Sequence, residues 1–290
     1  MDMSKKCRVW FFSILFLMGL VGIGKAEEKQ IATLSAYLGE VLLQKAGETT
    51  WQRAEEGTFL FEEDKIQTKE DSSAEIIFDY ENVIELSQNS LLEIKSLKIK
   101  EDDSKESLLK LEIGRVLAEV GEIPASSKFE IHTPTAVAGV RGTEFLVEEK
   151  DGESSVAVFK GKVGVRGIAK EGLMANEVLI PANYQTSVLR HRNPQIPYGL
   201  SKKMFLWKKN FAYLEKRRNQ SRTWWQGLNP SERNKLRENI NKYKKLPFKR
   251  QQEIKKKIEE LGWKKKLVQS NNWQPKPVYQ PPQRYPKIKR

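Results

Sequence analysis

Few residues in this 290-residue sequence could carry out covalent or metal chemistry. The histidines are His132 and His191, and the single cysteine is Cys7. The sequence contains no Gly-x-Ser-x-Gly nucleophile elbow and no Gly-x-x-x-x-Gly-Lys-Ser/Thr phosphate loop. Acidic pairs such as Asp102-Asp103 and Glu148-Glu149 are typical of solvated turns. The sequence therefore predicts a protein that is not an enzyme and that binds no cofactor or metal.

One stretch stands out as a candidate for recognition because glycines and hydroxyl side chains surround an arginine. Pro134 biases the residue before it towards extended backbone. Gly139 and Gly142 permit sharp turns on both sides of Arg141. Two interpretations stay open: the stretch fixes a crossover connection, or Arg141 and Thr143 face a pocket and bind an anionic ligand or a partner's carboxylate. The candidate residues are Thr133, Pro134, Thr135, Gly139, Arg141, Gly142, Thr143, Glu144 and Phe145.

The run from Thr133 to Phe145 resembles the signature of the FecR domain family, named for a periplasmic regulator of ferric-citrate uptake. Trp51, the segment 64–68 and the Gly161-Lys162-Val163 turn agree with that resemblance, which spans roughly residues 35–190. It implies a sensing or scaffolding domain. Regulators of the ferric-citrate type act on a sigma factor through a cytoplasmic segment followed by one membrane span. The start of this sequence differs from that arrangement.

The first 26 residues predict a secretory signal peptide. Lys5, Lys6 and Arg8 precede an apolar run, and Gly24-Lys25-Ala26 supplies small residues for cleavage. We expect export to the periplasm or cell envelope of a bacterium. An uncleaved anchor is the alternative, and only that alternative keeps a direct role in sigma-factor regulation.

Charge divides the rest of the chain into an acidic body and a basic C-terminal part. Residues 27–190 carry 19 basic and 31 acidic side chains, and residues 191–290 carry 28 basic and 6 acidic ones. The basic part should bind an anionic envelope polymer, a lipid surface or the acidic body itself, and no nucleic acid is expected after export. Alternatively, it is a solvated helical surface with a small tryptophan core. Its candidate contact residues are Lys208, Lys209, Arg217, Arg218, Trp224, Trp225, Lys255, Lys256, Lys257, Trp263, Lys264, Lys265 and Lys266.

Short apolar runs and turn residues between them predict an all-β domain over residues 27–190, either a sandwich or a short β-roll of about ten or more strands. Gly39, Gly114 and Gly161 each open a Gly-x-Val repeat, which suggests equivalent corners of a rolled sheet. Asp151-Gly152 and Lys160-Gly161 are typical of hairpin turns.

Beyond this domain, breaker residues predict a linker over 191–201, and helix-favouring residues predict a small basic helical region over 202–268. Asn229, Pro230 and Glu232 form a helix start with a capping box. The helical region is weakly similar to a bacterial domain of unknown function with repeated Trp, Pro and Arg. Residues 269–290 are rich in proline and basic residues and should be disordered.

Together these features favour a binding or sensing module tethered by the basic tail. A scaffold that binds peptidoglycan or another anionic polymer is the alternative. The partner would be a periplasmic or outer-membrane protein, which the sequence does not identify, and oligomeric state stays open.

Overall fold

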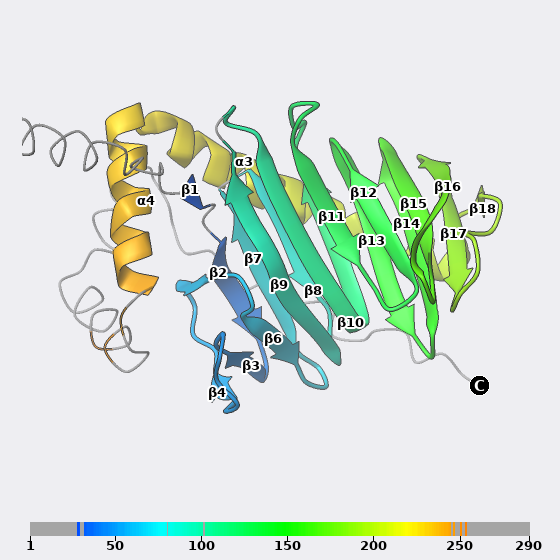
Figure 1. The fold of residues 1–290 in the computed structure, drawn as a ribbon, viewed down its shortest axis with the longest axis horizontal. Coiled ribbons are helices and arrows are strands. Elements are labelled where there is room, and N and C mark those ends of the chain that lie inside the picture. The colour runs from blue at the N-terminus through cyan, green and yellow to red at the C-terminus, as the bar shows by residue number, and fades with distance from the viewer. Residues whose placement is uncertain are drawn as a thin grey trace, which may run out of the picture.

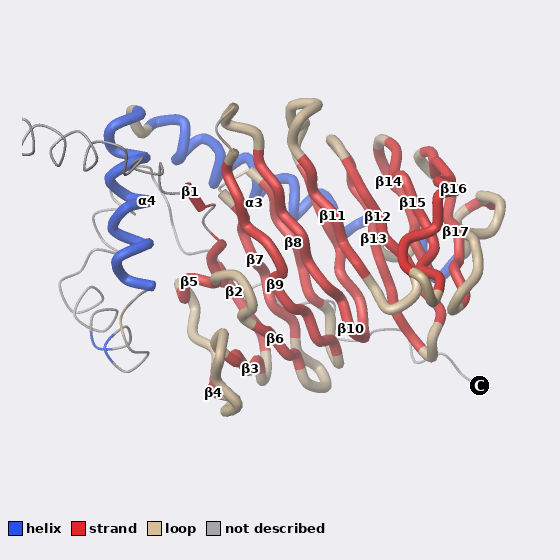
Figure 2. The backbone as a smooth tube through the Cα atoms, viewed as in Figure 1, coloured by secondary structure: helices blue, strands red, loops and turns tan. Residues whose placement is uncertain are grey.

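The computed structural model describes residues 28–29, 32–79, 81–100, 102–244, 246, 250 and 253. Within this part of the chain the protein is mainly β, and α-helices begin only after residue 201 (Figures 1 and 2). The predicted fold class, a β domain followed by a small helical region, is therefore confirmed. The predictions of a signal peptide over 1–26 and a disordered tail over 269–290 lie outside the described residues.

Strand pairings define two sheets that share β10. Sheet A runs in the order β4, β3, β6, β9, β10, β11, β12, β15, β16, with β1 beside the far end of β9. Its pairs are antiparallel except β10 with β11. The bounds are β1 Glu28–Lys29, β3 Val41–Gln44, β4 Gln52–Arg53, β6 Lys65–Thr68, β9 Ser90–Ile99, β10 Lys105–Val120, β11 Lys128–His132, β12 Ala136–Val140, β15 Lys162–Ala169 and β16 Gly172–Pro181.

Sheet B runs in the order β5, β2, β7, β8, β10, β13, β14, β17, β18, with antiparallel pairs throughout. Its additional strands are β2 Ala32–Leu38, β5 Thr58–Leu60, β7 Ser73–Phe78, β8 Asn82–Leu86, β13 Thr143–Lys150, β14 Glu153–Lys160, β17 Tyr184–Leu189 and β18 Tyr198–Gly199. The inward side chains of both sheets form one apolar core.

Strand β10 shows how the chain passes between the sheets. Leu109 and Leu111 point into the core from the half that pairs in sheet A, whereas Val116 and Ala118 do so from the half in sheet B. The inward positions change from odd to even numbers at Gly114, whose φ is +98°. A side chain is rarely accommodated at that φ, so glycine makes the crossing possible.

The two other Gly-x-Val sites are also corners between the sheets. Gly39 (φ +72°) lies between β2 and β3, and Gly161 (φ +79°) lies between β14 and β15. The repeat prediction is thus confirmed, and the fold combines the facing layers of a sandwich with the crossing strands of a roll. The hairpin prediction is confirmed for Asp151-Gly152, which joins the paired β13 and β14. It is wrong for Lys160-Gly161, because β14 and β15 belong to different sheets.

The chain continues past β17 without leaving sheet B. The Gln195 N–H donates to the Ser187 carbonyl (2.9 Å), and β18 pairs with β17. The Leu200 N–H donates to the Asn183 carbonyl (3.1 Å). The segment expected as a linker over 191–201 therefore includes residues that cover the edge of β17.

Helices α2 (Lys202–Phe205), α3 (Lys208–Gly227) and α4 (Pro230–Lys244) follow. In Figure 1, α3 runs along the back of the strands and α4 stands at the end of the molecule near β1 and β2. The predicted capping box is confirmed: the Glu232 N–H donates to Asn229 Oδ1 (2.9 Å), and the Asn229 N–H donates to Glu232 Oε2 (2.8 Å).

Candidate functional site

The first half of the stretch 133–145 is held by a buried hydroxyl cluster of Thr133, Thr135, Ser154 and Glu149. Thr133 Oγ1 lies 2.6 Å from Ser154 Oγ, and Ser154 Oγ donates to Glu149 Oε2 (2.5 Å). Thr135 hydrogen-bonds to the same serine. The cluster joins the turn before β12 to β13 and β14. This arrangement agrees with the interpretation that the stretch fixes a connection between the sheets.

The second half of the stretch forms the corner from β12 in sheet A to β13 in sheet B. Gly142 has φ +65°, and its N–H donates to the Gly121 carbonyl (3.0 Å). Gly161 packs against this corner, because a Cβ added there would lie 2.6 Å from the Gly142 carbonyl oxygen. Both glycines are therefore required by the backbone, and Gly139, which lacks a positive φ, is not in this class.

The side chains at this corner have different environments. Arg141 is exposed, and no hydrogen bond or ion pair joins it to the described residues. Thr143 is buried, and its hydroxyl has no hydrogen-bond partner within the described part. Glu144 pairs with Lys160 (3.6 Å) instead of Arg141, and Phe145 is fully buried in the core. Arg141 is thus the one charged member of the stretch that is open to solvent.

A larger polar site lies on the outer face of sheet B, beneath the helices. Apolar side chains form its floor, and Met204, Trp207, Phe211 and Leu214 of α2–α3 pack on them. The floor consists of Ile77, Val83, Leu117, Leu146, Ala157 and Phe159. The Phe211 ring lies 4.8 Å from that of Phe159, so the helices complete a second apolar core.

Carboxylates among this apolar floor receive the basic side chains of α3. Arg217 Nη2 lies 2.8 Å from Glu75 Oε1, and Arg218 Nε lies 3.1 Å from Glu119 Oε1. Burial raises the pKa of Glu119 to about 7 despite Arg218. Burial, with the charge of Glu75, likewise raises the pKa of Glu85 to about 7. Neither carboxylate oxygen of Glu85 has a hydrogen-bond partner among the described residues.

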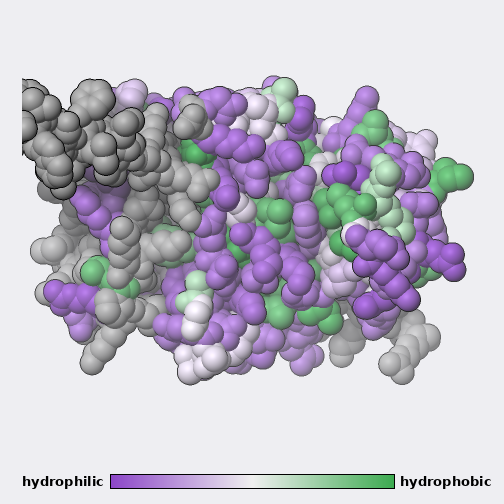
Figure 3. All heavy atoms as spheres, in the orientation of Figure 1, coloured by the Kyte–Doolittle hydropathy of each residue, from purple (hydrophilic) through white to green (hydrophobic). Residues whose placement is uncertain are grey.

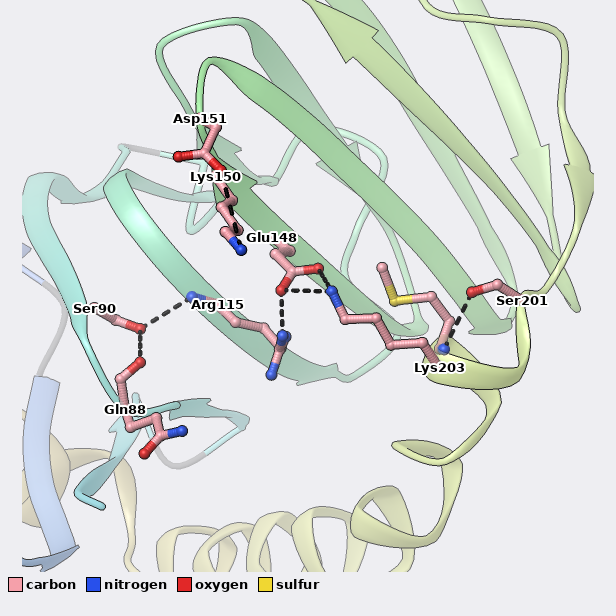
Figure 4. A network of polar contacts seen from close by, with 9 residues as sticks. Gln88, Ser90, Arg115, Glu148, Lys150, Asp151, Ser201 and Lys203 are labelled. Atoms are coloured by element: carbon pink, nitrogen blue, oxygen red, sulfur yellow. Dashed lines mark hydrogen bonds and ion pairs between the residues drawn. The ribbon is translucent and has the colours of Figure 1, made fainter. Parts of the chain in front are cut away.

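Glu148 links the sheet to the start of the helical region (Figure 4). It accepts hydrogen bonds from Arg115 of β10 and from Lys203 Nζ of α2 (2.8 Å). Burial alone would raise the pKa of Glu148, but Arg115 and Lys203 hold it below its usual value. The Arg115 guanidinium also stacks 4.3 Å from the Trp207 ring. Cations from both the sheet and the helix therefore share one buried carboxylate.

The candidate contacts of the basic part divide into three groups. Lys208 and Lys209 are exposed, whereas Arg217 and Arg218 lie on the acidic side chains of sheet B. Trp225 is buried, with the Arg233 guanidinium 5.4 Å from its ring. The other predicted contacts lie outside the described side chains: Trp224, Lys255, Lys256, Lys257, Trp263, Lys264, Lys265 and Lys266.

The acidic partners of the helices were not predicted as contacts from the sequence. Glu148 and Glu149 were expected in a solvated turn, but that prediction was wrong because both lie buried in β13. Glu75, Glu85 and Glu119 interrupt otherwise apolar strands, as in Ala74-Glu75-Ile76-Ile77-Phe78. A charged residue at an outward strand position is usually solvated, so the pattern alone gives no sign of a covering helix. The sequence feature that did indicate contact between the β domain and the basic part of the chain was their opposite net charge.

Across the described residues, no group of His, Cys, Asp and Glu side chains is arranged to hold a metal ion. None of the helices in the described ranges is long and apolar enough to cross a membrane.

The comparison with protein families agrees with the resemblance seen in the sequence. Residues 64–164 match the model of the FecR protein family. Two crystal structures of a proposed anti-sigma factor from Parabacteroides distasonis ATCC 8503 are similar at 18% and 19% identity, with TM-scores of 0.40 and 0.39. Each similarity covers 49% of this chain and 63% of the other. No curated protein matches the chain. The match to the FecR family over residues 64–164 includes the run from Thr133 to Phe145, on which the resemblance in the sequence depends.

Proposed function

We propose that this protein is a non-enzymatic FecR-like binding and sensing module of the bacterial cell envelope. The FecR-family segment supports the sensing role. The non-enzymatic part of the proposal rests on the sequence, which has two histidines and one cysteine. Export follows from the predicted signal peptide over residues 1–26.

The observation that carries the proposal is the way α2–α3 bind sheet B. Arg217, Arg218 and Lys203 each contact a carboxylate of that sheet, and the apolar side of α3 completes a core with it. These cations are committed within the protein and are not free for an external polymer. The β domain and the first basic helices form one unit, and tethering to an anionic surface is left to exposed side chains such as Lys208 and Lys209 and to the basic residues that follow.

An envelope scaffold is the alternative within the same proposal, with binding to peptidoglycan or another anionic polymer as its main activity. Regulation of a sigma factor is a further alternative, and it requires an uncleaved N-terminus. N-terminal sequencing of the protein purified from its host separates these: a start at Glu27 excludes direct contact with a cytoplasmic sigma factor, and an intact N-terminus supports it.

Co-sedimentation tests the tether. Residues 27–290 would be mixed with cell-wall sacculi or anionic lipid vesicles over a salt series. The first variant changes six lysines to glutamine: Lys255, Lys256, Lys257, Lys264, Lys265 and Lys266. A matched control changes six lysines of the β domain: Lys65, Lys69, Lys95, Lys110, Lys128 and Lys150.

We expect the unchanged protein and the control to pellet at low salt and to be released as salt rises, because screening weakens contacts between exposed charges. The first variant should lose about tenfold in binding, which corresponds to about 1.4 kcal/mol. Equal pelleting of the first variant and the unchanged protein would remove the tether from the proposal. It would leave the binding role of the β domain to be tested separately.

A further inference from the structure

The two sheets end differently at the same end of the molecule. The last long strand of sheet B, β17, is covered by β18 and by a backbone hydrogen bond from Gln195, and Leu200 bonds to Asn183 directly before it. The last strand of sheet A is β16, and among the described strands it pairs only with β15. Outside that pairing, no backbone hydrogen bond within the described residues involves 172–181. Along one edge of β16, the backbone donors and acceptors therefore have no partner among the described residues.

The free part of β16 has a defined length. A bulge in the pairing lies opposite Gly167, between the Arg166–Glu177 and Ile168–Leu173 pairs, and Pro181 ends the strand. Residues 177–180 between these two points pair regularly with β15. At about 3.3 Å per residue, this regularly paired segment is long enough for a partner strand of roughly four residues.

Native proteins usually protect a free edge with lysine, proline or an inward-pointing charge. Here Pro181 ends the segment, and Glu177 at its other end lies 3.7 Å from Arg166. Residues 178–180 between them are Val, Leu and Ile, and Leu179 is 61% exposed. Most of the large exposed apolar side chains of the described residues lie in the segment 173–206, and Tyr37, Trp51 and Ile113 are the exceptions. The remainder are Leu173, Leu179, Tyr184, Leu189, Ile196, Tyr198, Phe205 and Leu206.

An open apolar hollow adjoins this edge. It is lined by Leu200, Lys202, Phe205 and Leu206. The Leu200 N–H donates to the carbonyl of Asn183, so the hollow lies beside the turn that joins β16 to β17. In the space-filling view, hydrophobic side chains lie among hydrophilic ones at the end of the molecule that carries β15 and β16 (Figure 3).

The charge around the edge identifies the kind of partner. Residues 160–206 carry eight Lys and Arg side chains and only two acidic ones, in contrast to the acidic remainder of the β domain. Lys162 lies opposite Pro181 at one end of the free segment. The Arg192 backbone packs beside Gly167 and Met174 at the other end. Neither Lys162 nor Arg192 forms an ion pair in the described part, so both are available to an incoming acidic group.

We infer that β16 is a docking strand for an extended segment of another protein, with a short apolar β-forming centre and acidic residues at both ends. Main-chain hydrogen bonds to residues 177–180 extend sheet A, Leu179 contacts the apolar centre, and Lys162 and Arg192 bind the flanking acids. A second copy of this chain is disfavoured, because pairing β16 with itself would bring two basic rims together. This inference rests on the proposed binding role and names its partner class.

Fluorescence anisotropy with labelled nine-residue peptides tests the inference on the mature full chain. The acidic probe has a Val-Thr-Val-Thr-Val centre with two glutamates at each end, and the matched probe has lysines in place of the glutamates. We expect the acidic probe to bind with micromolar affinity and the lysine probe to bind at least tenfold more weakly. Equal binding of the two probes, or no binding of the acidic probe at millimolar concentration, would overturn the inference.

Two proline variants, Val178→Pro and Leu179→Pro, locate the contact. Consecutive residues of a strand direct their N–H groups to opposite sides, so one variant disrupts the β15 ladder and the other removes a donor only from the free edge. The variant that keeps the unfolding curve of the unchanged protein should lose at least tenfold in affinity. Unchanged affinity in that variant would contradict docking on β16.

The double charge reversal Lys162→Glu with Arg192→Glu should weaken binding of the acidic probe and strengthen binding of the lysine probe. Arg53→Glu, at the opposite edge of sheet A, is the control and should change neither. Sedimentation velocity of the unchanged protein should show a monomer. A dimer that the edge proline disperses would instead assign β16 to self-association and overturn the inference. The sacculus assay is independent of these outcomes, so failure of the docking strand and failure of the tether can be distinguished.

Discussion

The outer faces of the two sheets differ although the same strand, β10, contributes to both. In sheet A, Lys110 and Glu112 of β10 point outward and pair with each other in partial contact with solvent. In sheet B, the outward residues Leu117 and Glu119 are buried beneath α3. The comparison teaches that helix cover, not strand geometry, decides the fate of an outward carboxylate. On the open face it stays in contact with solvent. On the covered face it either receives a cation, as Glu119 does from Arg218, or has its pKa raised by burial, as Glu85 does.

The largest expected effect concerns the point where β10 passes from one face to the other. A Cβ added at Gly114 would lie 2.0 Å from Ser90 Oγ and 2.5 Å from Ser90 Cα. It would also displace the Ser90 hydroxyl that accepts from the Arg115 N–H (3.0 Å). We expect Gly114→Ala to lower the free energy of unfolding by about 4 kcal/mol or more, measured by urea denaturation.

Gly47→Ala is the matched control for the crossing. Gly47 also has a positive φ (+76°), but an added Cβ would meet nothing within 4 Å. This control should cost only about 1 kcal/mol, the strain of a left-handed backbone with a side chain. If both variants lower the free energy of unfolding equally, the close approach of Gly114 to Ser90 does not stabilise the passage of β10 between the two sheets.

The second largest loss of stability is expected where α3 packs on the outer face of sheet B. Phe211 is 2% exposed and packs on Phe159, so Phe211→Ala should lower the free energy of unfolding by about 3–4 kcal/mol. Phe205→Ala is the control, because Phe205 is 57% exposed and its loss should cost under about 0.5 kcal/mol. A small effect of Phe211→Ala would mean that α3 contributes little to the core of the β domain.

The sequence predicted the strands, turns and helix start of this protein more accurately than the contacts between them. Alternating apolar residues, the Gly-x-Val corners and the Asn229 cap are local signals, and the structure confirms them. The hairpin predicted at Lys160-Gly161 was wrong because the same turn residues can join strands of different sheets.

Tertiary contacts were harder to predict. The pairing of Arg217 with Glu75 joins residues 142 positions apart, and no local pattern indicates it. The free edge of β16 likewise depends on where the segment after β17 runs, which is a property of the complete fold.

Carboxylates on the outer faces of sheets A and B should also differ in how they make stability depend on pH. The raised pKa of Glu85, about 7 against 4.5 for an ordinary glutamate, means that the folded protein binds this proton more tightly than the unfolded chain does. Its ionisation therefore lowers stability as pH rises from about 4.5 to about 7, and the penalty is constant above that range. Glu85→Gln should raise the free energy of unfolding by up to about 3 kcal/mol at about pH 8 and change it little at about pH 4.

Glu112→Gln supplies the comparison on the open face of sheet A. Glu112 is paired with Lys110 and about one-third exposed, so this variant should change stability little at either pH. A similar gain at high pH in both variants would indicate a general effect of net charge and would remove the special role of burial at Glu85.

The smallest effect is expected for the pair of Glu130 and His132 on the open face. His132 Nε2 lies 2.9 Å from Glu130 Oε2, and the hydrogen bond from His132 lowers the pKa of Glu130. A lowered carboxyl pKa contributes stability above the usual pKa and loses it as the pH falls through the lower folded value. Because both side chains are partly exposed, Glu130→Gln should lower the free energy of unfolding by under about 0.5 kcal/mol near neutral pH in urea denaturation.

Glu75→Gln, which weakens the buried contact with Arg217, should lower the free energy of unfolding several times more. If Glu130→Gln and Glu75→Gln lower the free energy of unfolding equally, the contact between Glu75 and Arg217 stabilises the protein no more than the partly exposed pair of Glu130 and His132. The difference between the two faces would then rest on apolar packing alone.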